Sequence, residues 1–386
     1  MPIKNRFAEM LPEITAWRRD FHENPELLFD THRTAGIVAD KLREFGLDEV
    51  TEGIGRTGVV GVIKGRATGS GKVIGLRADM DALPIIEATG AAHASKTPGK
   101  MHACGHDGHT AMLLGAAKYL AETRNFDGTV IVIFQPAEEG GGGGAEMCKD
   151  GMMDRWGIQE VYGMHNMPGL PLGEFAIREG AFFAATDQFE IFVEGKGGHA
   201  AKPQETVDTT VVAAQMVTAL QTVASRNHDP VKNLVVSVTS FRTESEAFNV
   251  IPQTVVLRGT VRTLDAETRD MAEGRIKGVA EGIVAAFGAR AEVKYHRGYP
   301  VMVNSPAQTA FAAEVASKVS GGCAPAPLVM GGEDFAFMLE ERPGAYILMG
   351  NGDTASVHHP EYDFDDNAIP AGCSWWAEIA EKRMPA

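Results

Sequence analysis

The chain of 386 residues lacks several features that would place it in particular classes of protein. It carries 36 basic against 51 acidic residues, a formal net charge of −15, so it has no excess of positive charge for neutralising a nucleic-acid backbone. No uninterrupted apolar run approaches the roughly 20 residues that a membrane-spanning helix needs. The N-terminal residues also lack the apolar stretch of a secretory signal peptide. We therefore predict a cytoplasmic protein that binds neither nucleic acid nor membrane.

Cysteine is also scarce. The four cysteines, Cys104, Cys148, Cys323 and Cys373, form no CxxC pair, and in a chain of this length they do not constitute a disulfide framework. Cys104 differs from the others because it lies two residues before His106. A thiolate and an imidazole at that spacing point the same way on an extended segment and can chelate a metal ion. A metal-binding thiolate also favours a reducing compartment.

The length predicts two domains, and the pattern of apolar residues changes along the chain. Residues 1–184 alternate helical and buried-strand patterns, which indicates an α/β fold with a mostly parallel sheet. Between residues 185 and 296 the order becomes β-α-β-β-α-β, the ferredoxin-like pattern. We therefore predict an α/β domain formed by residues 1–184 and 297–386, interrupted by an α+β domain inserted at 185–296.

Side chains that bind metals recur after the Cys104-Gly-His106 segment. Glu138 and Glu139 follow one predicted strand, His165 follows another, and His358 lies near the C-terminus. Because ligands of open α/β sheets bind beyond the carboxyl ends of the strands, we expect these side chains to meet. Thiolate, imidazole and carboxylate together suit zinc, with manganese, cobalt and nickel as alternatives.

The adjacent glutamates face opposite ways if Glu138 and Glu139 lie on extended backbone. One carboxylate can then bind a metal ion while its neighbour faces a water molecule. A metal ion acidifies such a water, and a free carboxylate can take its proton near neutral pH. A water molecule and a carboxylate arranged in this way can attack an amide carbonyl. The spacing alone leaves open which glutamate binds the metal ion and which accepts the proton.

Seven longer motifs extend over most of the chain: LRADMDALP (76–84), MHACGHDGHTAMLLGAA (101–117), FQPAEEGGGG (134–143), GMHN (163–166), GKGGHAAKP (195–203), NVIP (249–252) and GGEDFAFM (331–338). Together they resemble the N-acyl-amino-acid amidohydrolase family, which includes the hippurate hydrolases and the plant auxin-conjugate hydrolases. This family is a branch of the metal-dependent aminoacylase and carboxypeptidase group. The resemblance implies hydrolysis of a linear amide C–N bond and an insert that serves as lid and dimerisation domain.

The resemblance also implies a role for each matching residue. Two divalent metal ions per subunit are expected on Cys104, His106, Glu139, His165 and His358. Glu138 would be the general base and later the proton donor to the leaving amine. The family usually has His-Asn-Pro or His-Ser-Pro where this chain has His358-His359-Pro360, so His358 is the expected ligand.

In the insert, the resemblance implies that His199 polarises the scissile carbonyl, often from the partner subunit of a homodimer or a dimer of dimers. Asn249 and Arg258 match positions that hold the free carboxylate of the substrate, a task that suits a guanidinium group geometrically. The chain departs from the family in a short loop at 350–357 and in Lys202, where methionine is common. These departures leave the preferred acyl group open.

We therefore expect a binuclear metal amidohydrolase that cleaves an N-acyl amino acid, either hippurate-like or N-acetylated, to a carboxylic acid and a free amino acid. A dipeptidase or carboxypeptidase using the same site is one alternative, and a non-catalytic metal- or ligand-binding homologue is another. Asp79 and Asp81 either orient the metal ligands or cap a turn. His22 is expected to be structural or solvated, whereas His102 lies close enough in sequence to approach the metal ions.

Overall fold

The computed structural model describes residues 5–386 and divides the chain into two compact units. The first, called the catalytic domain below, comprises Met1–Gly180, Val303–Pro327 and Asp334–Ala386, and the second, called the insert, comprises Ala181–Met302 and Leu328–Glu333. The sequence placed the boundaries at 184/185 and 296/297 and assigned residues 328–333 to the catalytic domain. Within the insert, these residues bond to the entering chain, because the N–H of Ala184 donates to the carbonyl oxygen of Val329 at 3.0 Å. Over residues 5–386, no helix combines the length and the apolarity that crossing a membrane requires.

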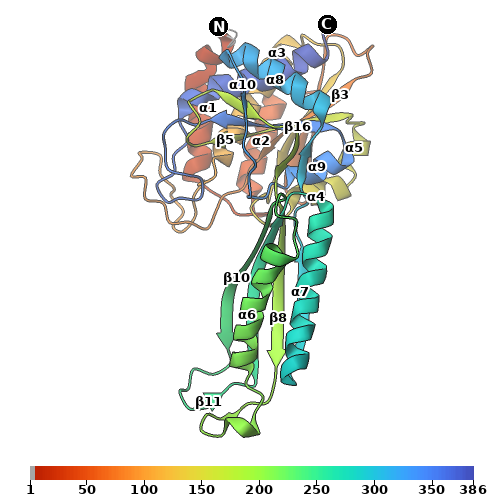
Figure 1. Ribbon diagram of the computed structural model, residues 1–386. Helices are drawn as coiled ribbons and strands as arrows, with labels where there is room; N and C mark the ends of the chain where they lie inside the picture. The colour runs from red at the N-terminus through yellow and green to blue at the C-terminus, as the bar shows by residue number, and fades with distance from the viewer. Residues whose placement is uncertain (1–4) are drawn as a thin grey trace. The chain divides into compact units, whose positions relative to one another are not determined.

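An eight-stranded sheet forms the centre of the catalytic domain, which Figure 1 shows with the strands β3, β5 and β16 labelled. The strand order of this sheet is β1-β2-β4-β3-β5-β16-β6-β15. The four central strands β4, β3, β5 and β16 are parallel to one another, whereas β1 and β2 are antiparallel at one edge. The strand bounds are β1 Glu49–Ile54, β2 Gly58–Lys64, β3 Val73–Asp79, β4 Thr129–Gln135, β5 Glu160–Met167, β6 Phe175–Ile177, β15 Ala324–Pro325 and β16 Gly344–Gly350. The predicted α/β class with a mostly parallel sheet is confirmed.

Helices cover both faces of this sheet. Ala345 and Ile347 of β16 face one large core, whereas Tyr346 faces the other way and packs on Phe335, with ring centroids 5.1 Å apart. Because both faces are buried, the sequences of the central strands are continuously apolar and do not alternate between apolar and polar residues. The large core contains α1 Asn5–Glu23, α2 His32–Glu44, α3 His106–Thr123, α8 Pro306–Ser320 and α10 Ile369–Arg383, and the shorter helices are α4 Gly143–Lys149, α5 Met152–Arg155 and α9 Phe335–Glu341.

The insert has the predicted β-α-β-β-α-β order. Its sheet is fully antiparallel in the order β10-β12-β8-β13, and α6 and α7 run along one face of it (Figure 1). The bounds are β8 Ala185–Glu194, α6 Thr209–Arg226, β10 Leu234–Thr243, β12 Thr254–Thr263, α7 Ala266–Phe287 and β13 Arg290–Arg297. A separate pair of short strands is formed by β9 Gly198–His199 and β11 Val250–Ile251. The strands β7 Gly180–Phe183 and β14 Met302–Asn304 lie where the chain enters and leaves the insert.

Glu160, the first residue of β5, joins three elements of the catalytic domain. Its carboxylate accepts hydrogen bonds from Arg383 of α10 at 2.7 Å, Tyr162 at 2.8 Å and Gln308 of α8 at 3.2 Å. Burial raises the pKa of Glu160, but the hydrogen bonds from Arg383 and Tyr162 outweigh it and hold the pKa below its usual value. A carboxyl group with a lowered pKa contributes stability above its unfolded pKa, and this stability is lost as the pH falls.

Replacing Glu160 by glutamine is therefore expected to reduce the free energy of unfolding by about 1–3 kcal/mol at neutral pH. The deficit should shrink below the unfolded pKa of about 4.5, because the wild-type carboxylate is then progressively protonated as well. Urea unfolding of both proteins at neutral pH and at about pH 3.5 checks this. An equal deficit at both pH values would contradict the charge-based explanation.

Candidate metal centre

The expected metal ligands meet beyond the carboxyl ends of the parallel strands of the catalytic domain. Potential ligand atoms of Cys104, His106 and His165 lie within 4.8 Å of one another. The same holds for Cys104, Glu139 and His358, and again for His106, Glu138 and Glu139. Because the three groups share members, they form one continuous cluster rather than three separate sites.

Two histidines of the cluster are held with one ring nitrogen directed toward it. His106 donates its Nδ1–H to the carbonyl oxygen of Asp81 at 2.7 Å, and its buried Nε2 has no hydrogen-bond partner among the described residues. His165 donates its Nδ1–H to the carbonyl oxygen of Asn166 at 2.6 Å, which leaves Nε2 3.3 Å from the Sγ of Cys104. Histidines that bind metals characteristically donate their other N–H in this way.

The two glutamates are fixed by their main chain. The carboxylate of Asp81 accepts the N–H of Glu138 at 2.9 Å and the N–H of Glu139 at 3.1 Å. Ala137, which precedes them, has a φ of 54°, a left-handed conformation that is uncommon for a residue with a side chain. Oε1 of Glu139 lies 3.2 Å from Nε2 of His358. The turn after β4 therefore presents both carboxylates to the cluster in a set conformation.

His358 lies in the loop after β16 and is the most exposed of these side chains. Its backbone also adopts a left-handed conformation, with a φ of 66°, and its N–H donates to the carbonyl oxygen of Ala103 at 2.7 Å. Half of its side chain is exposed, 52% against 9% for Glu139. Its main chain is thus fixed beside the Cys104 segment, while its imidazole remains accessible from solvent.

The charges of the cluster fit a divalent cation. Burial and then the carboxylates of Glu139 and Glu138 raise the pKa of the Cys104 thiol well above its usual value. Burial and then His109 lower the pKa of His165, so that its imidazole is neutral, the form that binds metals. A coordinating metal ion deprotonates a thiol and offsets neighbouring negative charge. Thiolate, imidazole and carboxylate are together a donor set for zinc and related ions.

Asp79 lies directly beneath the cluster. It accepts hydrogen bonds from Nδ1 of His109 at 2.6 Å and from Arg77 at 2.7 Å, and one of its carboxylate oxygens is 3.7 Å from Nε2 of His106. Burial raises the pKa of Asp79, but His106, Arg77 and His109 outweigh it and hold that pKa well below its usual value. Of the two roles considered for Asp79 and Asp81, the orientation of ligands matches these contacts.

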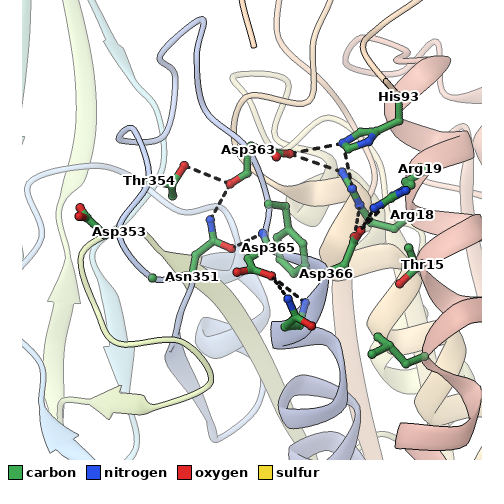
Figure 2. A pocket seen from close by; sticks show the side chains of 14 residues that line it. Thr15, Arg18, Arg19, His93, Asn351, Asp353, Thr354, Asp363, Asp365 and Asp366 are labelled. Atoms are coloured by element: carbon green, nitrogen blue, oxygen red, sulfur yellow. Dashed lines mark hydrogen bonds and ion pairs between the residues drawn. The ribbon is translucent and has the colours of Figure 1, made fainter. Parts of the chain in front are cut away.

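A second buried polar network borders the cluster, and sequence reasoning missed it. Asp107, the second residue of α3, contacts Nδ1 of His22 at 2.8 Å and a guanidinium nitrogen of Arg18 at 3.3 Å. Burial lowers the pKa of His22, but Asp107 outweighs it and raises the pKa to about 9. Arg18 also donates to Asp366 at 2.7 Å beside a cavity of about 480 Å³, where His93 contacts Arg18 as well (Figure 2). None of the expected metal ligands lines this cavity.

The expected catalytic residue His199 and the two expected substrate-binding residues, Asn249 and Arg258, belong to the insert. His199 is exposed on β9, and its Nδ1 accepts the N–H of Ala201 at 3.0 Å. The carbonyl oxygen of Asn249 accepts the N–H of Ala200 at 3.0 Å, which brings Asn249 next to the His199 segment. Arg258 lies on β12, where its Nε contacts Glu190 of β8 at 2.6 Å. Arg258 therefore already has an acidic partner within the insert.

The fold and the cluster together define a class of protein. Thiolate, imidazole and carboxylate side chains at the carboxyl edge of an α/β sheet, with one further glutamate beside them, are the arrangement of a metal-dependent hydrolase. Residues 75–382 match the model of peptidase family M20/M25/M40, and the chain belongs to this family. The resemblance drawn from the sequence motifs and the predicted hydrolase class are thereby confirmed.

Relatives span the full length of the chain. It is 43% identical to the hippurate hydrolase of Campylobacter jejuni, over 100% of both chains. It is 40% identical to the N-acetylcysteine deacetylase of Bacillus subtilis, over 94% of both chains. Among solved structures, it resembles a dinuclear metal-binding peptidase of family M20 from Bacillus subtilis, with a TM-score of 0.85 and 36% identity over 98% of this chain and 99% of that chain.

Proposed function

We propose that this protein is a cytoplasmic, homodimeric amidohydrolase that uses two divalent metal ions to cleave an N-acyl amino acid to a carboxylic acid and a free amino acid. The observation that carries the proposal is the continuous cluster of ligand atoms with Glu138 at its side. The names of the two curated relatives support an acylated amino acid as the substrate. The buried thiol of Cys104 supports a reducing compartment.

The residues that would hold the ions are Cys104, His106, Glu139, His165 and His358. Bound zinc, manganese, cobalt or nickel would polarise the scissile carbonyl and lower the pKa of a water molecule in the site. Asp79 and Asp81, which neighbour these ligand residues, keep the ligands oriented when an ion binds or leaves. A relative of this family with a solved structure is a dinuclear metal-binding peptidase, which supports two ions here.

Glu138 is the residue for proton transfer. It is buried, its main chain is fixed by Asp81, and its neighbour Glu139 is the carboxylate that contacts His358. Glu138 accepts a proton from the attacking water as the new C–O bond forms. It then delivers that proton to the amide nitrogen as the C–N bond breaks, so that the amine leaves in neutral form.

His199 is suited to stabilise the negative charge that develops on the carbonyl oxygen. Because its Nδ1 accepts the N–H of Ala201, the proton of the neutral ring lies on Nε2, which makes that nitrogen a donor. Asn249 beside it, and Arg258 after exchanging its contact with Glu190, would bind the free carboxylate of the substrate. These roles rest on the matching motifs and on the accessibility of the side chains.

Replacing His199 by alanine is expected to lower kcat by about 100- to 1,000-fold, with metal content unchanged. The side chain is exposed, so the variant should fold as the parent does. Kinetics of amino-acid release, with metal content measured alongside, checks this. Mixing this variant with Glu138→Gln protein tests action across a dimer, because mixed dimers then regain one complete site. No recovery in verified mixed dimers would contradict action in trans.

The proposed function is tested by the release of free amino acid from a panel of substrates. Chelated protein is reloaded with zinc, manganese, cobalt or nickel and given hippurate, several N-acetyl amino acids and simple dipeptides. Metal-dependent release from the acylated amino acids supports the proposal and identifies the acyl preference. Release from dipeptides alone would make the protein a dipeptidase. No release from protein that holds two ions would make it a binding protein.

A further inference from the structure

Asn166 occupies a central position behind the metal cluster, although it contributes no expected ligand. It is fully buried at the end of β5, directly after His165. Its side-chain Nδ2 donates to the carbonyl oxygen of Cys104 at 2.6 Å, and its Oδ1 accepts the hydroxyl hydrogen of Tyr362 at 2.8 Å. The amide side chain of Asn166 thus connects the segment that contains Cys104 to the loop that carries His358.

The main chain of Asn166 makes two further connections. Its carbonyl oxygen accepts the Nδ1–H of His165 at 2.6 Å, which sets the tautomer of that ring and leaves Nε2 toward the thiol. Its N–H donates to Nε2 of His109 at 2.9 Å. His109 must then carry its proton on Nδ1, the nitrogen that contacts Asp79. Both imidazole orientations therefore depend on the position of this one residue.

The turn between Cys104 and His106 approaches Asn166 closely. Gly105, the residue between Cys104 and His106, has a φ of 84°, and a Cβ placed there would lie 2.3 Å from Nδ2 of Asn166 and 2.4 Å from the hydroxyl oxygen of Tyr362. The Cys-Gly-His turn is thus pressed directly against the amide and the phenol. A shift of Asn166 toward this turn would displace the turn, and with it both ligands.

We propose that Asn166 is the positioning residue that holds Cys104, His165 and the His358 loop in the geometry needed to bind the metal ions. This inference rests on the proposed binuclear function. The amide is suited to the task because it offers a donor and an acceptor at once. Partners of this kind around a metal site typically change metal affinity or activity by about 10- to 100-fold when they are removed.

Asn304 provides a matched control for a purely structural role. It is also fully buried in the catalytic domain, and its Nδ2 donates to the carbonyl oxygens of Arg178 at 2.8 Å and Tyr346 at 2.9 Å. Its Oδ1 accepts the N–H of Tyr346 at 2.7 Å. Asn304 thus has the same chemistry and burial as Asn166, without a bond to any residue of the metal cluster.

The experiment compares Asn166→Leu and Asn304→Leu with the parent protein, using Co²⁺ as the probe. Affinity is measured by competition with a chromophoric chelator, and the thiolate-to-cobalt absorption band reports whether Cys104 binds the ion. We expect Asn166→Leu to bind Co²⁺ about 10- to 100-fold more weakly, with a shifted or weakened thiolate band. Asn304→Leu should lose conformational stability but keep the affinity and the band of the parent.

Tyr362→Phe removes only the hydrogen bond from the Tyr362 hydroxyl to Asn166. This variant replaces Asn166→Leu in the experiment if Asn166→Leu does not fold. We expect it to weaken Co²⁺ binding in the same direction and by a smaller factor. A folded Asn166→Leu or Tyr362→Phe variant with the Co²⁺ affinity and the thiolate band of the parent would overturn the inference. An equal loss of Co²⁺ affinity in Asn304→Leu would also overturn it. If the parent itself binds no Co²⁺, the proposed function fails as well, so the two failures are distinguishable.

Discussion

Replacing Glu138 by glutamine is expected to lower kcat by about 100- to 10,000-fold, the usual contribution of a general acid–base residue. Glutamine has the same shape and can keep the main-chain bond to Asp81, but its amide cannot accept a proton from water. The contacts among Cys104, Glu139 and His358 do not involve the Glu138 carboxylate. Metal content should therefore stay at the level of the parent.

The kinetics of amino-acid release and the metal content of the purified variant check this expectation together. Glu139→Gln is the matched control, because it makes the same change at the neighbouring position. It should lose metal as well as activity, since it removes an expected ligand. A Glu138→Gln protein that turns over at the parental rate would show that another group takes the proton.

Removal of the metal ions by a chelator is expected to abolish hydrolysis and to lower the melting temperature. Without a cation, the nearby carboxylates of Glu139 and Glu138 and the burial of the site disfavour the thiolate of Cys104, as its raised pKa shows. A ligand present at 100 times its Kd stabilises the folded state by about 2.7 kcal/mol, and this contribution disappears on chelation. Hydrolysis and melting temperature should both recover when divalent metal is returned.

Calorimetry and activity measurements before chelation, after chelation and after reloading test this. The Glu139→Gln variant is again the control, because a protein that has already lost affinity should melt at nearly the same temperature with and without chelator. Chelated protein that is verified to be metal-free and still hydrolyses its substrate would contradict a metal-dependent mechanism.

The fold could be predicted from the sequence wherever the burial of an element determines the spacing of its apolar residues. The runs 130–134 and 346–349 are apolar at every position because helices cover both faces of the sheet, and each lies within an observed strand. The insert was recognisable because its helices cover one face only, so that its strands alternate. Residues 328–333 carry no such signal. Their place in the insert depends on main-chain bonds such as that between Ala184 and Val329.

The site could be predicted only where chemistry is visible in the residue type. Cysteine, histidine and paired glutamates at strand ends indicate a metal cluster without any structure. Asn166 has no such signal, because an asparagine after a strand is ordinary until its partners are known. His22 was expected to be structural or solvated, and it is structural, because it is buried against Asp107. His102 is buried with neither ring nitrogen hydrogen-bonded among the described residues, which its position in the motif did not predict.

The place of β16 in the sheet sets the order in which a newly made chain can mature. This strand lies between β5 and β6, yet it is synthesised more than 150 residues after both, because the whole insert separates them. The insert contains its own core and can fold on the ribosome while the sheet of the catalytic domain still lacks β16. His358 emerges later still. Insertion of β16, completion of the ligand set by His358 and packing of α10 are therefore all late events of biosynthesis. A chain cut short before them would carry a finished insert on an incomplete catalytic domain.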